Sequence, residues 1–178
     1  MNNLIWHDFT QIPSTHTHAI DLVTSTIISK PVLITADMQT AGYGTNNRTW
    51  ESALGNLFAT FCILEKMCNF EKFHVKLKNH EQPTQAIICA NILQKTILTL
   101  TGKTLELKEP NDLLYKGKKC SGVMVSKIQD SSKQPVLCIS IGFNCARGPK
   151  TSQPTTYIKC NKHELIFSWI YLLCGQEE

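Results

Sequence analysis

The sequence carries few charges, and no segment is dominated by one sign of charge. Charged residues make up 18% of the 178 positions, and the formal net charge is only +4. No run of Lys and Arg builds the basic stripe that nucleic-acid binding needs, so we expect no nucleic-acid partner. A small anionic ligand or an acidic protein partner fits this mild positive charge better.

Long apolar runs are absent as well. The longest apolar stretch, Leu165 to Cys174, is too short to cross a bilayer, so no membrane association is expected. The first residues, Met1 to Asp8, lack the basic start and apolar core of a secretion signal. Both observations predict a cytoplasmic protein.

The eight cysteines include no C-x-x-C pair, which is the usual mark of a zinc or redox motif. Several lie within apolar runs, such as Phe61 to Leu64 and Val136 to Ile139. We interpret them as reduced thiols that act as small core residues of a cytosolic protein, in preference to zinc ligands or a disulfide framework.

The chain length suits a single domain over residues 1–178, large enough to bury its own core. Hydrophobic spacing and capping residues predict helices at 14–23, with Ser14 as the cap, at 83–102 and at 162–174. Strands are expected at 32–35, 55–64, 73–78, 122–128 and 136–143, with the last two joined as an antiparallel hairpin. Because strands outnumber helices, we predict an α+β sheet with its helices on one face.

Three familiar site motifs fail on inspection. Gly102-Lys103-Thr104 could end a phosphate-binding P-loop, but Ile97 stands where the first glycine belongs. The loop from Gly42 lacks the third glycine of a dinucleotide fingerprint. His16 and His18 are two residues apart on a predicted helix and point to different faces, so we interpret them as surface histidines rather than metal ligands.

The most informative segment is the polar stretch 108–122, which lies between two apolar segments. We expect it to form one tight turn that gathers Lys108, Asn111, Asp112, Lys119 and Gly122. Such a cluster is costly to keep without a ligand, and the lysines predict that the ligand is an anion.

Short motifs elsewhere occur in one order with this stretch. They are Ser14-Thr15, Gln39 to Gly44, Arg48 to Trp50, Gly55 to Phe58, Lys108 to Asp112, Lys119 with Gly122, and Gly142 to Asn144. The series resembles the catalytic domain of biotin protein ligases, in the biotin/lipoate protein ligase superfamily, over about residues 12–169. The resemblance implies an α+β fold of the class II synthetase-like biotin/lipoate ligase type, with a mixed, largely antiparallel sheet flanked by helices.

The chemistry that this resemblance implies has two steps. Biotin reacts with Mg-ATP to give biotinyl-5'-AMP, which then acylates a lysine of the biotin carboxyl carrier protein of acetyl-CoA carboxylase. Biotin, ATP and Mg²⁺ are the implied ligands, and a homodimer is left open. Relative to the family, we expect neither an N-terminal DNA-binding domain nor a C-terminal β-barrel domain in this chain.

The resemblance also assigns roles by position. The implied catalytic residues are Lys119, Lys108, Asp112 and Arg48, with Asp112 as an indirect Mg²⁺ contact. The implied biotin-binding residues are Ser14, Thr15, Gln39, Gly42, Trp50, Lys119 and Gly122. The implied ATP-binding residues are Arg48, Trp50, Lys108, Asn111 and Asn144.

Departures from the family pattern leave alternatives open. Where family members read G-R-G-R-x-x-R-x-W, this chain has Tyr43 and Thr45 in place of the first two arginines and keeps Arg48; Glu109 replaces a tryptophan. Neither Tyr nor Thr can supply the bidentate charge of Arg. The sequence therefore fits an impaired but active ligase, a non-catalytic biotin- or carrier-binding relative, or a lipoate or octanoyl transferase of the same superfamily.

Overall fold

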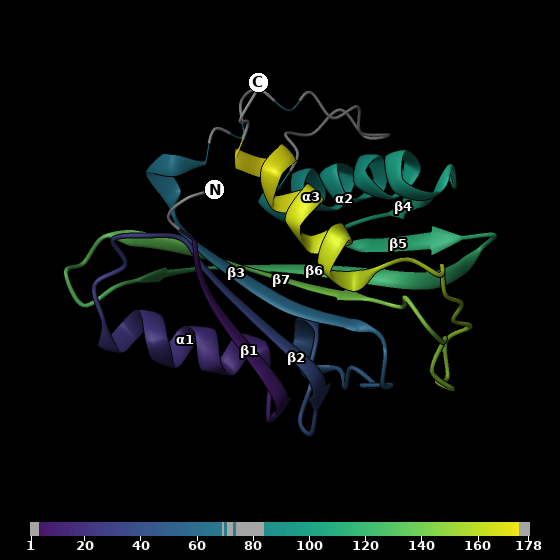
Figure 1. The fold of residues 1–178 in the computed structure, drawn as a ribbon, viewed down its shortest axis with the longest axis horizontal. Coiled ribbons are helices and arrows are strands. Elements are labelled where there is room, and N and C mark those ends of the chain that lie inside the picture. The colour runs from purple at the N-terminus through teal and green to yellow at the C-terminus, as the bar shows by residue number, and fades with distance from the viewer. Residues whose placement is uncertain (1–3, 69, 71–72, 74–83, 175–178) are drawn as a thin grey trace.

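The computed structural model describes residues 4–68, 70, 73 and 84–174. This part of the chain forms one seven-stranded sheet with helices packed on it (Figure 1). In chain order the elements are β1 (Ile5–Ile12), α1 (Thr15–Ser25), β2 (Val32–Gln39), η1 (Thr45–Asn47), β3 (Leu57–Leu64), η2 (Glu65–Met67), α2 (Gln85–Thr101), β4 (Glu106–Lys108), β5 (Asp112–Tyr115), β6 (Lys118–Gln129), β7 (Pro135–Phe143) and α3 (Lys162–Cys174).

The strand order in the sheet is β1-β2-β3-β7-β6-β5-β4. Only β1 and β2 pair in parallel, joined through α1, and the five other pairs are antiparallel. The expected α+β fold with a mixed, largely antiparallel sheet flanked by helices is confirmed, as is the hairpin formed by β6 and β7.

The helices cover both faces of the sheet, so the prediction that they lie on one face is wrong. Figure 1 shows α1 below the sheet and α2 with α3 above it. The reason lies in the strands, where neighbouring residues such as Leu33 and Ile34 are both fully buried but belong to different apolar clusters. Successive side chains of a strand point to opposite faces, so each face needs its own cover.

Local capping chemistry accounts for the helix boundaries. The Ser14 hydroxyl accepts a hydrogen bond from the Thr17 amide at 3.3 Å and starts α1, as expected. Helix α2 ends at Gly102, which takes a left-handed φ of 68°. The expected start of α2 at residue 83 lies outside the described residues. Helix α3 has the predicted bounds, and the Asn161 side chain accepts from the His163 and Glu164 amides before its first turn.

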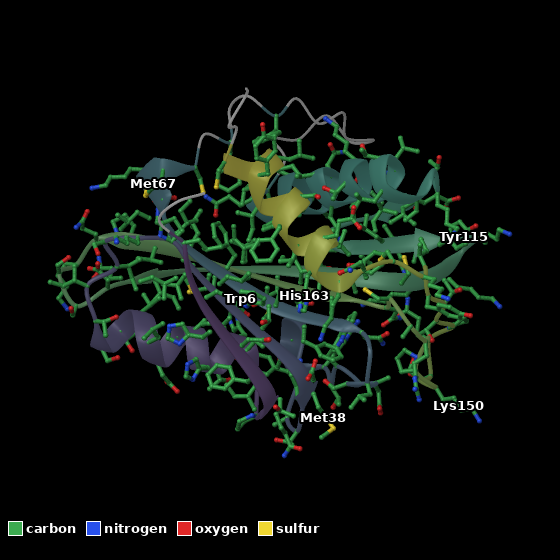
Figure 2. All side chains as sticks on the ribbon, in the orientation of Figure 1. Trp6, Met38, Met67, Tyr115, Lys150 and His163 are labelled. Carbon is green, nitrogen blue, oxygen red and sulfur yellow. The ribbon has the colours of Figure 1, made fainter. Side chains whose placement is uncertain are left out.

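Three strands were not expected from the sequence. Strand β1 lies at the edge of the sheet and is largely exposed, so its apolar alternation is weak, although Trp6 packs edge-on against His163 of α3 at 5.5 Å (Figure 2). The segment 108–122, predicted as one tight turn, contains the end of β4, all of β5 and the start of β6. The short strand predicted at 73–78 falls outside the described residues from residue 74 on.

The cysteines behave largely as small core residues. Cys89, Cys120 and Cys145 are buried in the apolar cluster beneath α2 and α3, and Cys62 and Cys138 in the cluster beneath α1, all as thiols. This confirms the interpretation for these five. None of the helices in the described part of the chain is long and apolar enough to span a membrane.

Candidate active site

The predicted site residues meet in one cavity of about 340 Å³ on the α1 side of the sheet. Every residue that the sequence assigned to the site lines it, except Gly42 and Asn144. Strands β3, β6 and β7 supply its floor through alternate positions that point away from α2, namely Phe58, Met124, Ser140 and Gly142. The strand period of two therefore decides which side chains reach the cavity.

Sheet register assembles the polar segment 108–122, and this corrects the prediction of one tight turn. Lys108 lies opposite Asp112 in the β4–β5 pair, and Asp112 lies opposite Gly122 in the β5–β6 pair. The tight turn itself is only Lys116-Gly117, both at positive φ, between β5 and β6. Three neighbouring strands thus bring these residues together.

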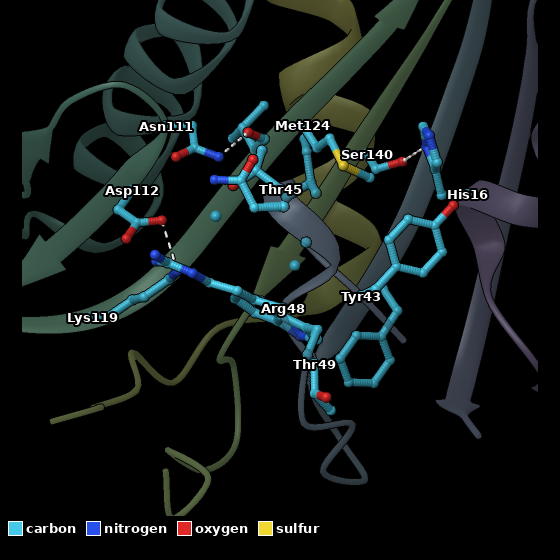
Figure 3. Close-up of a pocket in the computed structure, with 18 of the residues that line it drawn as sticks. His16, Tyr43, Thr45, Arg48, Thr49, Asn111, Asp112, Lys119, Met124 and Ser140 are labelled. Atoms are coloured by element: carbon cyan, nitrogen blue, oxygen red, sulfur yellow. Dashed lines mark hydrogen bonds and ion pairs between the residues drawn. The ribbon is translucent and has the colours of Figure 1, made fainter. Parts of the chain in front are cut away.

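The charged end of the cavity is organised around Lys119. Its ammonium lies 2.7 Å from the Asp112 carboxylate (Figure 3). It also lies 5.2 Å from the centre of the Trp50 ring. The Lys119 backbone is fixed by bonds to Pro154 and Thr156. Since an ammonium has three donors, Lys119 can hold Asp112 and still bind an anion in the cavity.

Asn111 is partly committed to the protein. Its Nδ2 donates to the Val123 carbonyl at 3.0 Å, and its own carbonyl accepts from the Val123 amide at 2.9 Å. These two bonds anchor the β4–β5 connection to β6 beside Asp112. The Asn111 side chain lines the cavity from this anchored position.

The opposite end of the cavity is uncharged and rich in hydroxyl groups. The Thr15 amide and hydroxyl both donate to Gln39 Oε1, at 2.8 and 3.2 Å, and Ser14 lies beside them at the start of α1. Gly42 packs behind Gln39, where an added Cβ would lie 2.8 Å from Nε2. Gly42 therefore belongs to the site as a support for Gln39 rather than as a lining residue.

A short hairpin at residues 42–50 forms one wall of the cavity. Tyr43 and Thr49 form an antiparallel bridge, and the Gly44 amide donates to the Arg48 carbonyl at 2.8 Å. The Tyr43 ring lies edge-on to His16 at 5.8 Å, and its hydroxyl accepts from Thr17 at 3.4 Å. Tyr43 thus ties the hairpin to α1 (Figure 3).

Trp50 lies flat against two glycines of the floor. A Cβ on Gly142 would meet the indole at 2.5 Å, and one on Gly122 would meet it at 3.1 Å. The indole Nε1 is buried and has no acceptor among the described residues. A buried donor without a partner is rare and costly, so this group is a candidate contact for a ligand.

A second cavity of about 850 Å³ lies on the other side of Trp50. It shares Arg48, Trp50 and Lys119 with the first cavity and adds Lys150 from an outer loop (Figure 2). Asn144 lines it, but its side chain is buried and bonds to Thr156 and Asn56 at 2.9 and 3.3 Å. Asn144 therefore holds the loop in place.

The sequence did not assign several residues of the cavity to the site, among them His16 and Gly142. His16 is 4% exposed and hydrogen-bonded, so its interpretation as a surface histidine is wrong, whereas His18 packs half-buried against Phe9. Burial lowers the pKa of His16 below its usual value. Gly142 was not assigned to the site. The available signal was its spacing of two residues from Ser140 on β7, which places both on the same side of the sheet.

Known proteins are similar to this chain in sequence and in fold. The family model "Biotin/lipoate A/B protein ligase family" matches residues 9–144. The bifunctional ligase/repressor BirA of Bacillus subtilis is 29% identical over 147 residues, which are 83% of this chain and 42% of that protein. The chain therefore spans about two fifths of the length of this curated relative.

Solved structures agree. Biotin protein ligase from Leishmania major in complex with biotin superposes with a TM-score of 0.77 at 25% identity, over 98% of this chain and 73% of that one. The Aquifex aeolicus biotin protein ligase in complex with biotin and ATP gives a TM-score of 0.70 at 22% identity, over 97% and 69%. With a family model that covers most of its length, the chain belongs to the biotin/lipoate A/B protein ligase family.

Proposed function

We propose that this protein is a biotin protein ligase that forms biotinyl-5'-AMP from biotin and ATP and transfers biotin to a lysine of a biotin carboxyl carrier protein. The observation that carries this proposal is the polarity of one cavity. Uncharged hydroxyl and carboxamide groups occupy one end and lysines the other. Biotin has the same division, with an uncharged ureido ring at one end and a carboxylate at the other.

The uncharged end suits a ureido ring better than the dithiolane of lipoate or an alkyl chain. Gln39 Oε1 already accepts two bonds from Thr15, while Nε2 has only a 3.5 Å contact to Ser52. The carboxamide can therefore donate to a carbonyl oxygen. A ligand without polar atoms would leave these groups unpaired, at about 1–3 kcal/mol each.

The charged end suits the first chemical step. In that step a carboxylate oxygen of biotin forms a bond to the α-phosphorus of ATP, and the bond to the departing pyrophosphate breaks. Lys119 is the residue we assign between the two anions, because its ammonium faces the cavity and its backbone is fixed. Arg48 and Lys108 add positive charge for the phosphates.

Mg²⁺ enters this scheme with ATP as part of the substrate. The described residues contain no cluster of three His, Cys, Asp or Glu side chains that could cage a metal. Two carboxylates, Glu109 and Asp112, do line the cavity, and Mg²⁺ typically takes phosphates, water and one or two carboxylates. The residues present therefore fit a metal held mainly by nucleotide.

The second step requires a base for the incoming lysine. Its amine must lose a proton as it attacks the acyl carbon and AMP departs. We assign this to Asp112, whose carboxylate lies next to Lys119 at the mouth of the cavity. The two solved biotin protein ligases described above, both in complex with biotin, support biotin as the acyl group.

A non-catalytic role is the second candidate, and one observation favours it. Tyr43 and Thr45 stand where the family has arginines, and Tyr43 is engaged with α1 instead of the cavity's charged end. Binding of biotin without activation would then be the whole function.

One assay separates these candidates. The purified protein is incubated with Mg-ATP, labelled biotin and a carrier domain, with the carrier's target lysine changed to arginine as a control. We expect label only on the carrier that keeps its target lysine. Neither lipoate nor octanoate should displace bound biotin. Biotin binding without labelled carrier would leave the non-catalytic role. Carrier labelled in a parallel reaction with labelled lipoate in place of biotin would identify a lipoate ligase.

A further inference from the structure

A continuous chain of hydrogen bonds runs behind the uncharged end of the cavity. It starts at Ser126 on β6 and ends at Gln39 on β2. The bonds in order are Ser126 Oγ to His16 Nε2 at 3.0 Å, His16 Nδ1 to Ser140 Oγ at 2.7 Å, Ser140 to Thr60 at 2.8 Å, Thr60 to Thr15 at 3.0 Å, and Thr15 Oγ1 to Gln39 Oε1 at 3.2 Å. His16 is the only ring in this chain.

The direction of the chain follows from one obligatory donor. A backbone amide can only donate, so the Gln39 atom at 2.8 Å from the Thr15 amide is its oxygen. The Thr15 hydroxyl therefore donates to Gln39 and must accept from Thr60. By the same reasoning, Thr60 accepts from Ser140, because each hydroxyl has a single proton.

This order assigns the tautomer of His16. Once the Ser140 proton is used on Thr60, its oxygen must accept from His16 Nδ1–H. Nε2 is then the acceptor for the Ser126 hydroxyl. The ring is 4% exposed, and burial lowers the pKa of His16, which keeps the imidazole neutral. The Tyr43 ring covers it from the hairpin side.

We propose that His16 is a positioning residue that makes the pocket selective for a ureido ring, because its Nδ1–H donor satisfies Ser140 and so holds the chain in the direction that the Thr15 amide requires. The chain uses both lone pairs of Gln39 Oε1, so Gln39 presents only its NH₂ donors to the ligand. Thr15 keeps one lone pair for a ureido N–H. This inference rests on the proposed function, because it concerns how the same cavity recognises biotin.

The direct test is the state of the His16 ring in the native protein. Nitrogen-15 NMR of the imidazoles distinguishes a protonated nitrogen from an unprotonated one, and a His16→Asn spectrum assigns the signal. We expect protonated Nδ1 and unprotonated Nε2. The Nε2–H tautomer, or a rapidly exchanging ring, would overturn the proposal whether or not biotin binds.

The functional test compares His16→Leu and His16→Asn with His18→Leu as the matched control, since His18 lies on the same helix away from the cavity. We expect His16→Leu to weaken biotin binding about tenfold in calorimetry and to leave ATP affinity unchanged. His16→Asn should restore biotin affinity to within about threefold, because an amide N–H can replace Nδ1–H.

The possible outcomes distinguish a positioning role of His16 from a structural one. Equal loss of biotin and ATP affinity in His16→Leu, or the same loss in His18→Leu, would indicate a merely structural role and overturn the inference. Ser140→Ala breaks the chain one bond further on and should reproduce the loss for biotin alone. If the native protein binds no biotin, the proposed function fails, and the NMR result still tests the direction of the chain.

Discussion

The two faces of the central sheet carry different chemistry although their residues alternate along the same strands. On β7, Leu137, Ile139 and Ile141 pack into the apolar cluster beneath α2 and α3, whereas Ser140 and Gly142 line the cavity on the α1 side. On β3, buried Thr60 likewise faces α1 between apolar neighbours. The face beneath α2 and α3, the apolar face, holds the larger apolar cluster, whereas the α1 face combines a smaller apolar cluster with buried hydroxyl groups and the cavity.

The difference between the two faces explains why the cavity can contain a buried polar group without a hydrogen-bond partner. Trp169 and Leu93, both fully buried, anchor α3 and α2 to the apolar face. The cavity face has the buried Trp50 Nε1 without a partner and glycines where larger residues would clash. The apolar face offsets those costs. Substitutions on each face test this division.

Loss of the Lys119 ammonium should have the largest effect, and it should lower activity rather than stability. Lys119→Ala removes the ammonium that we assign between carboxylate and phosphate, and we expect adenylate formation to fall about 10³-fold. The unfolding free energy should change by less than about 1 kcal/mol, because the pair with Asp112 is partly exposed. Pyrophosphate release and urea denaturation measure the two quantities. The exposed neighbour Lys118→Ala is the control, and full activity of Lys119→Ala would disprove the assigned role.

Truncation of a core residue on the apolar face should lower stability and leave ligand binding nearly unchanged. Ile139→Ala leaves a space beneath the helices, and we expect it to lower the unfolding free energy by about 3 kcal/mol. Biotin affinity measured well below the melting temperature should stay within about twofold. A parallel loss of biotin affinity in this variant would break the division between the faces.

A small addition on the cavity face should impair nucleotide binding. The Cβ of Gly142→Ala would lie 2.5 Å from the Trp50 indole and must displace it. Overpacking of this kind costs about 2 kcal/mol, so we expect roughly 30-fold weaker ATP binding by calorimetry. Gly44→Ala is the matched control, since its Cβ meets only the Arg48 carbonyl at 3.9 Å. Unchanged ATP binding in Gly142→Ala would show that the position of Trp50 does not affect nucleotide binding.

Restoring charge to the hairpin should have the smallest effect. Thr45→Arg adds a cation at the rim of the cavity, and one charged hydrogen bond should slow release of biotinyl-5'-AMP about tenfold. Thr45→Gln controls for length without charge. The release rate is followed by trapping free adenylate, and an equal rate in both variants would mean that position 45 does not reach the intermediate.

Much of the fold and site could be predicted from the sequence. The bounds of α3, the cap of α1 and the β6–β7 hairpin follow from signals within a few residues. The identities of Lys119, Asp112, Thr15 and Gln39 as cavity residues also followed, because the motifs keep one order along the chain.

The rest depended on contacts between distant residues. Strand β1 pairs at the edge of the sheet and carries little burial signal. His16 resembled a surface histidine because its partners, Ser126 and Ser140, are 110 and 124 residues away. Gly142 is recognisable as part of the site only when Trp50 is seen to lie against it.

The local elements and the kinds of chemistry available follow from short stretches of sequence, because capping, strand period and side-chain type act over a few residues. Which of these groups meet depends on how the strands pair. Sheet register sets Lys108, Asp112 and Gly122 side by side on three strands, and it joins Thr60 to Ser140 across 80 residues. Register is a property of paired strands, so no single segment of the sequence contains it.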